Sequence, residues 1–332
     1  MSVKKDTEYL SVSSRVRAME TRLLTRERLE RMIDAPDDMQ ALKILSECGF
    51  GEIGQTDPAA LETALNAARI AAYRELAAIV PDQSVLDIFR AKYDYHNAKV
   101  LLKSGRIGRS AEPLLLNGGR YDPVQLSDDL AKGSPGAYSS AFRLAVESAA
   151  KLLAEGGDAQ AADMLLDQAY YAEMSDLTDR CGNRFLQEYI RLSIDAANLR
   201  TCVRCARMER DALFLSNALL EGGSVSRSAL VKVGAQEAWT LYRGGELAAA
   251  AELADSLAKP DGAPLTAFER ACDDALMRSA QQCRRVPFGQ EVVIGYLLAL
   301  EAELTAVRIV MAGRRVGLDG DVIRQRLRAC YV

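Results

Sequence analysis

Apolar residues recur three or four positions apart along most of this 332-residue chain, which is the spacing of an amphipathic helix. Residues 8–33 keep this spacing throughout, with an opposite face rich in Arg and Glu, and are predicted to form one long helix. Alternating runs of Val, Ile or Thr, the pattern of strands, do not occur, and Pro occurs only 9 times. The pattern therefore predicts an all-α protein.

One helical segment carries an acid and an amide three positions apart, and the arrangement returns later in the chain. The first copy has Asp94 and Asn97 within residues 89–103, and the second has Asp195 and Asn198, 101 positions further on. Side chains three positions apart share one face of a helix, so each pair is predicted to face a common neighbour. Because internal repetition sets an architecture, each copy is expected to build the same kind of unit.

A third, more divergent copy lies in residues 296–310. Glu303 stands at its acid position and Ala306 at its amide position. The basic residue five positions after the acid is kept in all three copies, as Lys99, Arg200 and Arg308. The motif is therefore predicted to occur three times.

A Gly pair follows each of the first two copies, at positions 118–119 and 222–223. Adjacent glycines suit a turn with positive φ, and each turn is predicted to lead into a short helix. In the third copy, residues 317–323 are predicted to take the corresponding place. The agreement in spacing supports the repeat independently of the acid and amide.

The repeat predicts three similar helical units. We place them at residues 1–135, 136–262 and 263–332. The last segment is too short for a whole unit, so part of its helices is expected from the N-terminal segment or from residues 230–262.

Composition and charge exclude several classes of protein. The net charge of −4 gives no support to a nucleic-acid binder. No apolar run approaches the roughly 18 residues that span a membrane, and the first residues lack the apolar core of a targeting segment. The seven cysteines, an odd number mostly within helical patterns, are predicted to be reduced. These features predict a cytoplasmic protein without a transmembrane segment or a nucleic-acid partner.

The sequence offers little catalytic chemistry. His96 is the only histidine, which removes most hydrolase triads and His-based metal sites. Cys202 and Cys205 form a CxxC within a helical pattern, without the second pair that a zinc site needs. No phosphate-loop or dinucleotide-binding motif is present. No catalytic residue, metal or cofactor is therefore predicted.

The repeated acids and amides have two interpretations. Asp94, Asp195 and their neighbours can bind Mg²⁺ between facing helices, as in helical enzymes that cluster Asp residues, although no DDxxD-like density surrounds them. Alternatively, each Asp and Asn satisfies buried backbone groups inside its own unit. Recurrence in every copy favours the structural interpretation, because an active site does not need to be made three times.

A basic cluster near the end of the sequence is the candidate for contact with a partner. It comprises Arg314, Arg315, Arg324, Arg326 and Arg328. These arginines are equally consistent with contacts to an acidic partner and with solvated cations near helix C-termini, so both interpretations stay open.

The order of these motifs resembles that of a known family. Residues 14–24 and 268–273, the acid–amide pairs, and the ending Leu327-Arg-Ala-Cys-Tyr-Val332 are similar to the C subunit of archaeal and bacterial V/A-type rotary ATPases. The eukaryotic relative is the d subunit of the vacuolar ATPase. The resemblance covers essentially the whole chain, and no single motif in it is diagnostic.

The resemblance implies three similar helical units in a pseudo-threefold, funnel-shaped arrangement. It implies a non-catalytic socket in the central stalk that joins the rotor ring of proteolipid subunits to axle subunits of the D and F type. Such a protein lies on the cytoplasmic face of the membrane and transmits torque for ATP-coupled ion transport. It needs no cofactor, and the repeated residues become struts of each unit.

Two other functions stay open at this point. A helical Mg²⁺-dependent enzyme would lose activity on Asp195→Ala while keeping its fold. A generic helical adaptor would not purify with a rotor ring.

Overall fold

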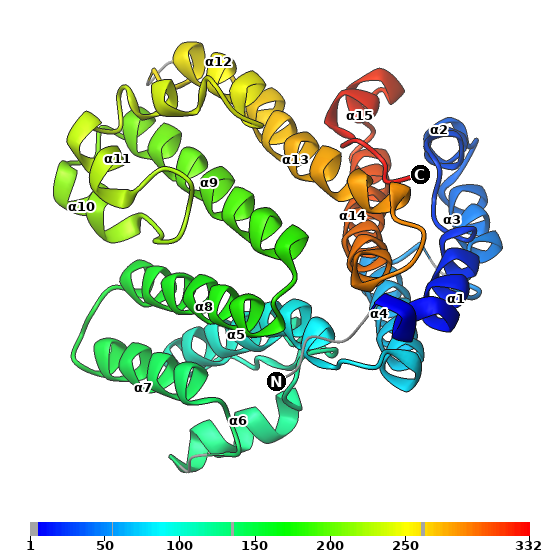
Figure 1. Ribbon diagram of the computed structural model, residues 1–332, viewed down its shortest axis with the longest axis horizontal. Helices are drawn as coiled ribbons and strands as arrows, with labels where there is room; N and C mark the ends of the chain where they lie inside the picture. Colours follow the sequence, from blue (N-terminus) through cyan, green and yellow to red (C-terminus); the bar gives the residue numbers. More distant parts are fainter. Residues whose placement is uncertain (1–5, 55, 134–135, 260–262) are drawn as a thin grey trace. The chain divides into compact units, whose positions relative to one another are not determined.

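All regular structure in the described part of the chain is helical. A computed structural model describes residues 6–54, 56–133, 136–259 and 263–332, and Figure 1 shows helices throughout these ranges. The all-α prediction is thus confirmed. The predicted boundaries at 135 and 262 lie outside the described residues, and the division into three units stays a prediction.

By its internal contacts, the chain divides into two compact units. The first contains residues 82–205 and 210–235, and the second contains the described residues up to Pro81 together with 206–209 and 236–332.

The first unit contains two long helices that carry the first two copies of the motif. Its elements are α5 (Ser84–Ile107), η2 (Glu112–Leu114), α6 (Pro123–Lys132), α7 (Ser140–Ala154), α8 (Ala159–Cys181), α9 (Arg184–Arg207, whose last two residues belong to the second unit), α10 (Ala212–Ala218) and α11 (Arg227–Val233). Helix α8 packs against α5 and α7. Tyr95 and Phe142 meet edge-on in the core between these helices, with ring centroids 5.1 Å apart.

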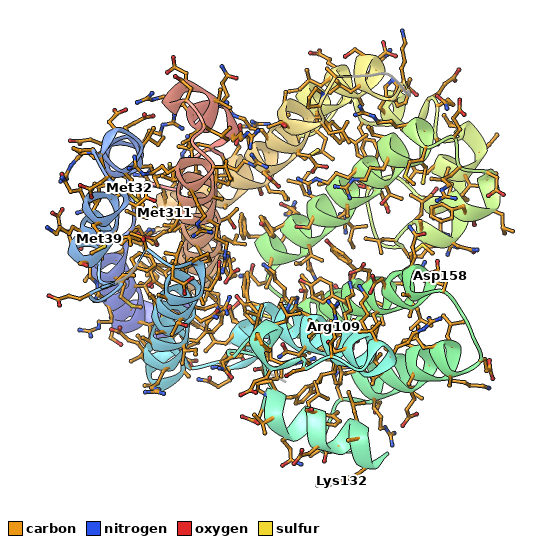
Figure 2. All side chains as sticks on the ribbon, turned by 180° about the vertical axis from the view of Figure 1, so that it is seen from behind. Met32, Met39, Arg109, Lys132, Asp158 and Met311 are labelled. Atoms are coloured by element: carbon orange, nitrogen blue, oxygen red, sulfur yellow. The ribbon has the colours of Figure 1, made fainter. Side chains whose placement is uncertain are left out.

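The second unit is built around one nearly buried helix, α14. Its elements are η1 (Asp6–Tyr9), α1 (Leu10–Glu20), α2 (Arg26–Asp34), α3 (Asp38–Glu47), α4 (Pro58–Ile79), η3 (Ala238–Tyr242), α12 (Ala248–Leu257), α13 (Thr266–Gln281), η4 (Gln282–Arg285), α14 (Gln290–Arg315) and α15 (Gly320–Arg326). Helix α14 contacts α1, α2, α3, α13 and α15. Helices α2 and α14 are in contact although they are far apart in the sequence, and Figure 2 labels a buried methionine of each, Met32 and Met311.

The single helix predicted over residues 8–33 is wrong. Helix α1 ends at Glu20, and α2 begins at Arg26. The Thr25 side chain accepts a hydrogen bond from the backbone N–H of Arg28 at 3.3 Å and so caps the new helix. Apolar spacing continues through the turn because both helices pack against α14, so periodicity alone does not reveal the break.

Membrane-spanning helices are absent from the described residues. No helix there combines the length and the low charge that crossing a lipid bilayer requires.

Candidate functional site

The Asp94 carboxylate joins helix α5 to the loop that precedes α6. Its Oδ1 accepts hydrogen bonds from the backbone N–H groups of Arg120 and Tyr121 at 2.9 and 3.2 Å. Its Oδ2 accepts from Nε of Arg120 at 2.6 Å. Asp94 is only 1% exposed, so these donors replace the water that the carboxylate loses.

The amide of the first motif holds the same loop one turn further along the helix. Asn97 donates from Nδ2 to the carbonyl of Leu116 and accepts at Oδ1 from the N–H of Leu116, both at 2.8 Å. This reciprocal pair satisfies both backbone groups of a residue that has no helical partner. The acid and the amide thus attach one loop to one helix face.

The second copy repeats this geometry. Oδ1 of Asp195 accepts from the N–H of Ser224 and Val225 at 2.9 and 3.3 Å, and Oδ2 accepts from the Ser224 hydroxyl at 2.6 Å. Asn198 makes the reciprocal pair with Leu220, at 2.8 and 2.9 Å. We call each such connection between motif acid and loop backbone a carboxylate joint.

The two glycines of each loop have different tasks. Gly118 and Gly222 take φ values of +108° and +97°, a region that favours glycine. A Cβ on Gly119 or Gly223 would overlap Oδ1 of the motif aspartate. The second glycine therefore lets the loop backbone approach the carboxylate.

The third carboxylate joint is made by a segment that the sequence did not indicate. Oε1 of Glu303, in α14, accepts from the backbone N–H of Leu24 at 3.0 Å. Residues 317–323 contain a turn with positive φ at Gly317 and the start of the short helix α15, as predicted, but they do not supply this donor. The turn between α1 and α2 supplies it, and Ala306 has no amide to form a reciprocal pair.

All three carboxylate joints share one register. In each, a donor is the residue directly before the N-cap residue of the next short helix: Tyr121 before Asp122, Val225 before Ser226, and Leu24 before Thr25. Counting back from the N-cap, Arg22 stands where the other loops have Gly119 and Gly223. The longer Glu side chain at position 303 suits a loop that has no glycine to bring it close.

The basic residue of the motif connects its helix to another helix of the same unit. Lys99 of α5 forms an ion pair with Asp167 of α8 at 2.5 Å. Arg308 of α14 forms one with Glu62 of α4 at 2.8 Å. Helix α4 is thus linked to α14 by an ion pair of the motif's basic residue, as α8 is to α5.

An exposed apolar side chain lies at or directly after the end of each motif helix, thirteen positions after the acid. Ile107 is 63% exposed, Met208 56% and Val316 70%. A single exposed apolar residue is unremarkable on a protein surface. Its return at one register in every copy is a further sign of repetition.

A buried network around Arg120 was missed at the level of sequence. Besides Asp94, Arg120 contacts Glu173 of α8 at 2.8 Å, and Glu173 also accepts from the hydroxyls of Tyr95 and Ser139 at 2.9 and 2.6 Å. The position of Glu173 in the sequence gives no sign that it belongs to a buried network. The Arg directly after the Gly pair was the available signal.

Burial raises the pKa of these carboxyl groups, whereas their hydrogen bonds and ion pairs lower it. Burial raises the pKa of Asp94 to about 6, although its hydrogen bonds with Arg120 lower it. Burial would also raise the pKa of Glu173, but hydrogen bonds from Arg120 and Ser139 outweigh burial and leave this pKa below its ordinary value. The Arg120 charge therefore stabilises Glu173 as the anion.

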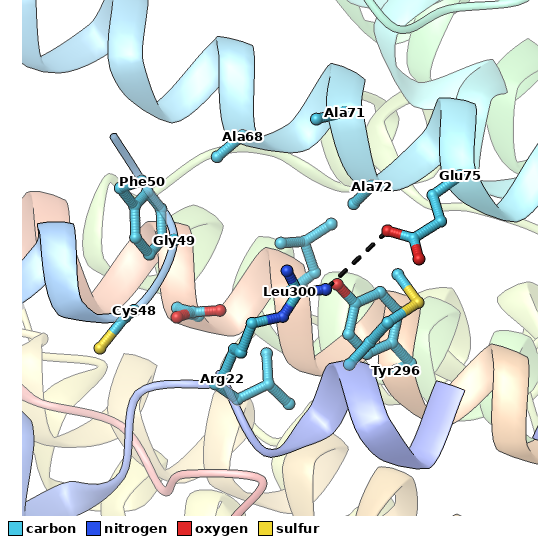
Figure 3. A pocket seen from close by; sticks show the side chains of 13 residues that line it. Arg22, Cys48, Gly49, Phe50, Ala68, Ala71, Ala72, Glu75, Tyr296 and Leu300 are labelled. Atoms are coloured by element: carbon cyan, nitrogen blue, oxygen red, sulfur yellow. Dashed lines mark ion pairs between the residues drawn. The ribbon is translucent and has the colours of Figure 1, made fainter. Parts of the chain in front are cut away.

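Glu303 differs because it lies beside a small cavity. Burial raises the pKa of its carboxyl group to about 8, and the hydrogen bond from Leu24 opposes this only in part. The cavity measures about 100 Å³. Figure 3 shows Arg22 and Glu75, which form an ion pair at 3.8 Å, close to Tyr296 in its wall.

Three of the five arginines predicted to contact a partner form ion pairs within the chain. Arg314 pairs with Asp38 and Arg328 with Asp273, at 2.8 and 2.7 Å. Arg324 pairs with Glu30 at 2.6 Å. For all five residues of the cluster, contact with a partner stays a prediction.

The remaining candidates for chemistry are engaged or buried. His96 contacts the carbonyl of Leu114 at 3.1 Å. Cys202 and Cys205 are buried thiols, and burial raises the pKa of both. Among the described residues, no group of three or more His, Cys, Asp or Glu side chains is arranged to hold a metal ion. The contacts of the motif acids and amides connect helices to loops, and those of the basic residues Lys99 and Arg308 connect helices to helices.

Comparison with known proteins gives one consistent result. The profile of the family described as "ATP synthase (C/AC39) subunit" matches residues 12–326. The C subunit of a V-type sodium ATPase from Enterococcus hirae is 23% identical over 98% of this chain and 99% of its own length. The C subunit of a V-type ATP synthase from Deinococcus radiodurans is 25% identical, covering 97% and 92%. The C subunit of an A-type ATP synthase from Haloferax volcanii is 28% identical over 71% of each chain.

Proposed function

Since the chain belongs to the ATP synthase C/AC39 subunit family, we propose that it is a non-catalytic central-stalk subunit of a V/A-type rotary ATPase. Its role is that of a socket between the membrane rotor ring and the central axle. It receives axle subunits of the D and F type, rests on the ring of proteolipid subunits at the cytoplasmic face, and transmits torque for ATP-coupled ion transport.

The observation that supports this proposal is that the carboxylate joint occurs three times in the chain. A part that transmits torque must resist shear between its helices and loops. Asp94, Asp195 and Glu303 each hold a loop backbone directly, without a long flexible side chain between loop and helix. Buried hydrogen bonds of this kind are costly to break, because their polar groups would be left without partners.

The repeat also supports a funnel of three units. The second unit of the structure combines the N-terminal helices with α14, so the third carboxylate joint links segments from opposite ends of the sequence. In this proposal the third repeat consists of α14 followed by α2, α3 and α4. A chain that closes on itself in this way suits a wall around a central opening.

The test is affinity capture of the tagged chain from membranes solubilised in mild detergent. The proposal predicts that axle and proteolipid subunits are both recovered with the chain. Recovery of unrelated proteins would favour a generic adaptor, and recovery of neither axle nor ring by the folded chain would contradict the proposal.

A Mg²⁺-dependent enzyme receives no support from a specific observation. The oxygens of Asp94 and Asp195 accept backbone hydrogen bonds, and Asp94 is neutralised by Arg120. We therefore propose no second function.

A further inference from the structure

The third carboxylate joint is chemically unlike the first two. Asp94 and Asp195 each accept from two backbone N–H groups and one side chain. Glu303 accepts one hydrogen bond among the described residues, from Leu24, and is only 8% exposed. A buried carboxylate with one neutral donor is poorly compensated as an anion. As a neutral acid, the same group still accepts the hydrogen bond from Leu24 through its carbonyl oxygen, and burying it costs much less free energy than burying the anion.

The groups that face Glu303 do not neutralise it fully. They are Arg22 in the turn before α2, Arg28 in α2, Cys48 after α3, Glu75 in α4, Tyr296 in α14, and Arg328, Cys330 and Tyr331 in the C-terminal segment. Arg22 and Arg328 are already paired with carboxylates, at 3.8 and 2.7 Å. Arg28 attracts the Glu303 anion, but its guanidinium donates to the carbonyl of Leu23 at 2.8 Å.

The cavity gives the buried group a route for proton exchange. Its volume of about 100 Å³ has room for several water molecules, and its wall includes Glu303 together with the polar side chains of Arg22 and Glu75. A titratable group in a dry core would exchange its proton only when the core opens. Here the proton can pass between Glu303 and water at the cavity wall.

We propose that the connection between α14 and the turn at residues 21–25 is proton-dependent: it is closed while Glu303 is a neutral acid and opens when Glu303 ionises. Opening releases the Leu24 N–H and lets more water surround the carboxylate than the cavity alone admits. Because the turn connects α1 to α2, the change reaches the N-terminal helices that cover α14. The two aspartate joints are not expected to open in this way, because each carboxylate is held by two backbone N–H groups and one side-chain donor.

The sign of the pH dependence follows from linkage. The pKa of Glu303 in the folded chain, about 8, lies above the ordinary value of 4.5 expected after unfolding. The folded state therefore binds this proton more tightly, and its contribution to stability is complete below about pH 4.5 and lost as pH rises through about 8. Glutamine at position 303 keeps the acceptor oxygen and removes the titration.

The experiment is hydrogen–deuterium exchange of the full chain between pH 7 and 9, corrected for the intrinsic effect of pH on exchange. With the folded pKa near 8, the ionised fraction rises about tenfold, so exchange in residues 21–25 should rise about tenfold as well. In Glu303→Gln it should change by less than about twofold.

Two controls keep the result decisive. Residues 222–226, at the second carboxylate joint of the same molecule, should show no such rise, and this comparison needs no variant. Asp195→Asn, a matched change in that joint, should weaken its own loop while leaving the response of residues 21–25 unchanged. Equal responses of residues 21–25 and 222–226 in the wild-type chain, or an undiminished response in Glu303→Gln, would overturn the proposal.

Discussion

At the scale of single residues, the carboxylate joints depend on how closely a loop can approach an acid. Gly223 lies so close to Asp195 that a Cβ would overlap Oδ1. The carboxylate cannot move away without losing Ser224 and Val225 as donors. The loop backbone can therefore reach the carboxylate only if the acid is a short Asp and the loop residue beside it is a Gly.

Gly223→Ala is expected to destabilise the chain by about 1–3 kcal/mol, because the added methyl group forces the loop away from Asp195. Urea unfolding of both proteins measures this difference. Gly105→Ala is the matched control, since Gly105 is a helical residue of α5 with open space around it. That control should stabilise the chain by about 0.5–1 kcal/mol. An equal loss of stability in both variants would contradict the idea that Gly223 is needed for the close approach of the loop to Asp195.

Asp195→Ala is expected to lower the free energy of unfolding by about 1–3 kcal/mol, because the N–H groups of Ser224 and Val225 lose their acceptor. Thermal unfolding followed by circular dichroism measures the change. Asp176→Ala removes an exposed acid of α8, which pairs with Arg180 on the same helix, and should change stability by less than about 0.5 kcal/mol. An unchanged melting temperature for Asp195→Ala would remove its structural role.

At the scale of elements, one arginine connects three parts of the first unit. Arg120 lies in the loop, Asp94 in α5 and Glu173 in α8, and the side chains of both acids are less than 5% exposed. Without Arg120, the two buried carboxylates of this cluster would have no compensating positive charge, which is costly at a pH where both are ionised.

Arg120→Met is therefore expected to destabilise the chain by about 3–5 kcal/mol at pH 7.5. The loss should be smaller at pH 5, where Asp94, with its pKa raised to about 6 even in the intact cluster, is largely protonated. Urea unfolding at the two pH values tests both parts. Arg180→Met, at an exposed pair within α8, is the control, and a loss of equal size at both pH values would contradict the role of ionised acids.

Sequence reasoning reached the helices and the motif acids but not the partners of those acids. Apolar periodicity predicts an all-α chain because amphipathic helices bury apolar residues that recur three or four positions apart. It failed over residues 8–33, where two helices pack on α14 and hide the turn between them. Leu24 was not predictable as the donor, because every residue except Pro has a backbone N–H and the sequence does not show which one is used. Glu173 was missed for a similar reason, since its partners come from separate elements.

At the scale of the whole molecule, the third carboxylate joint gives the N-terminal segment a clear role. The N–H of Leu24 satisfies an acid 279 positions away, and Arg314 and Arg324 pair with Asp38 and Glu30 across a similar separation. The arginines that the sequence offered for a partner thus also hold the two ends of the chain together.

The most direct measurement of the proposed function is a bridging experiment with three purified components. Detergent-solubilised rotor ring is immobilised, D- and F-type axle subunits are added, and the retained axle is measured with and without this chain. If the chain is the socket between ring and axle, the axle is retained only when the chain is present. Equal retention without the chain, or a folded chain that binds neither component, would contradict this role.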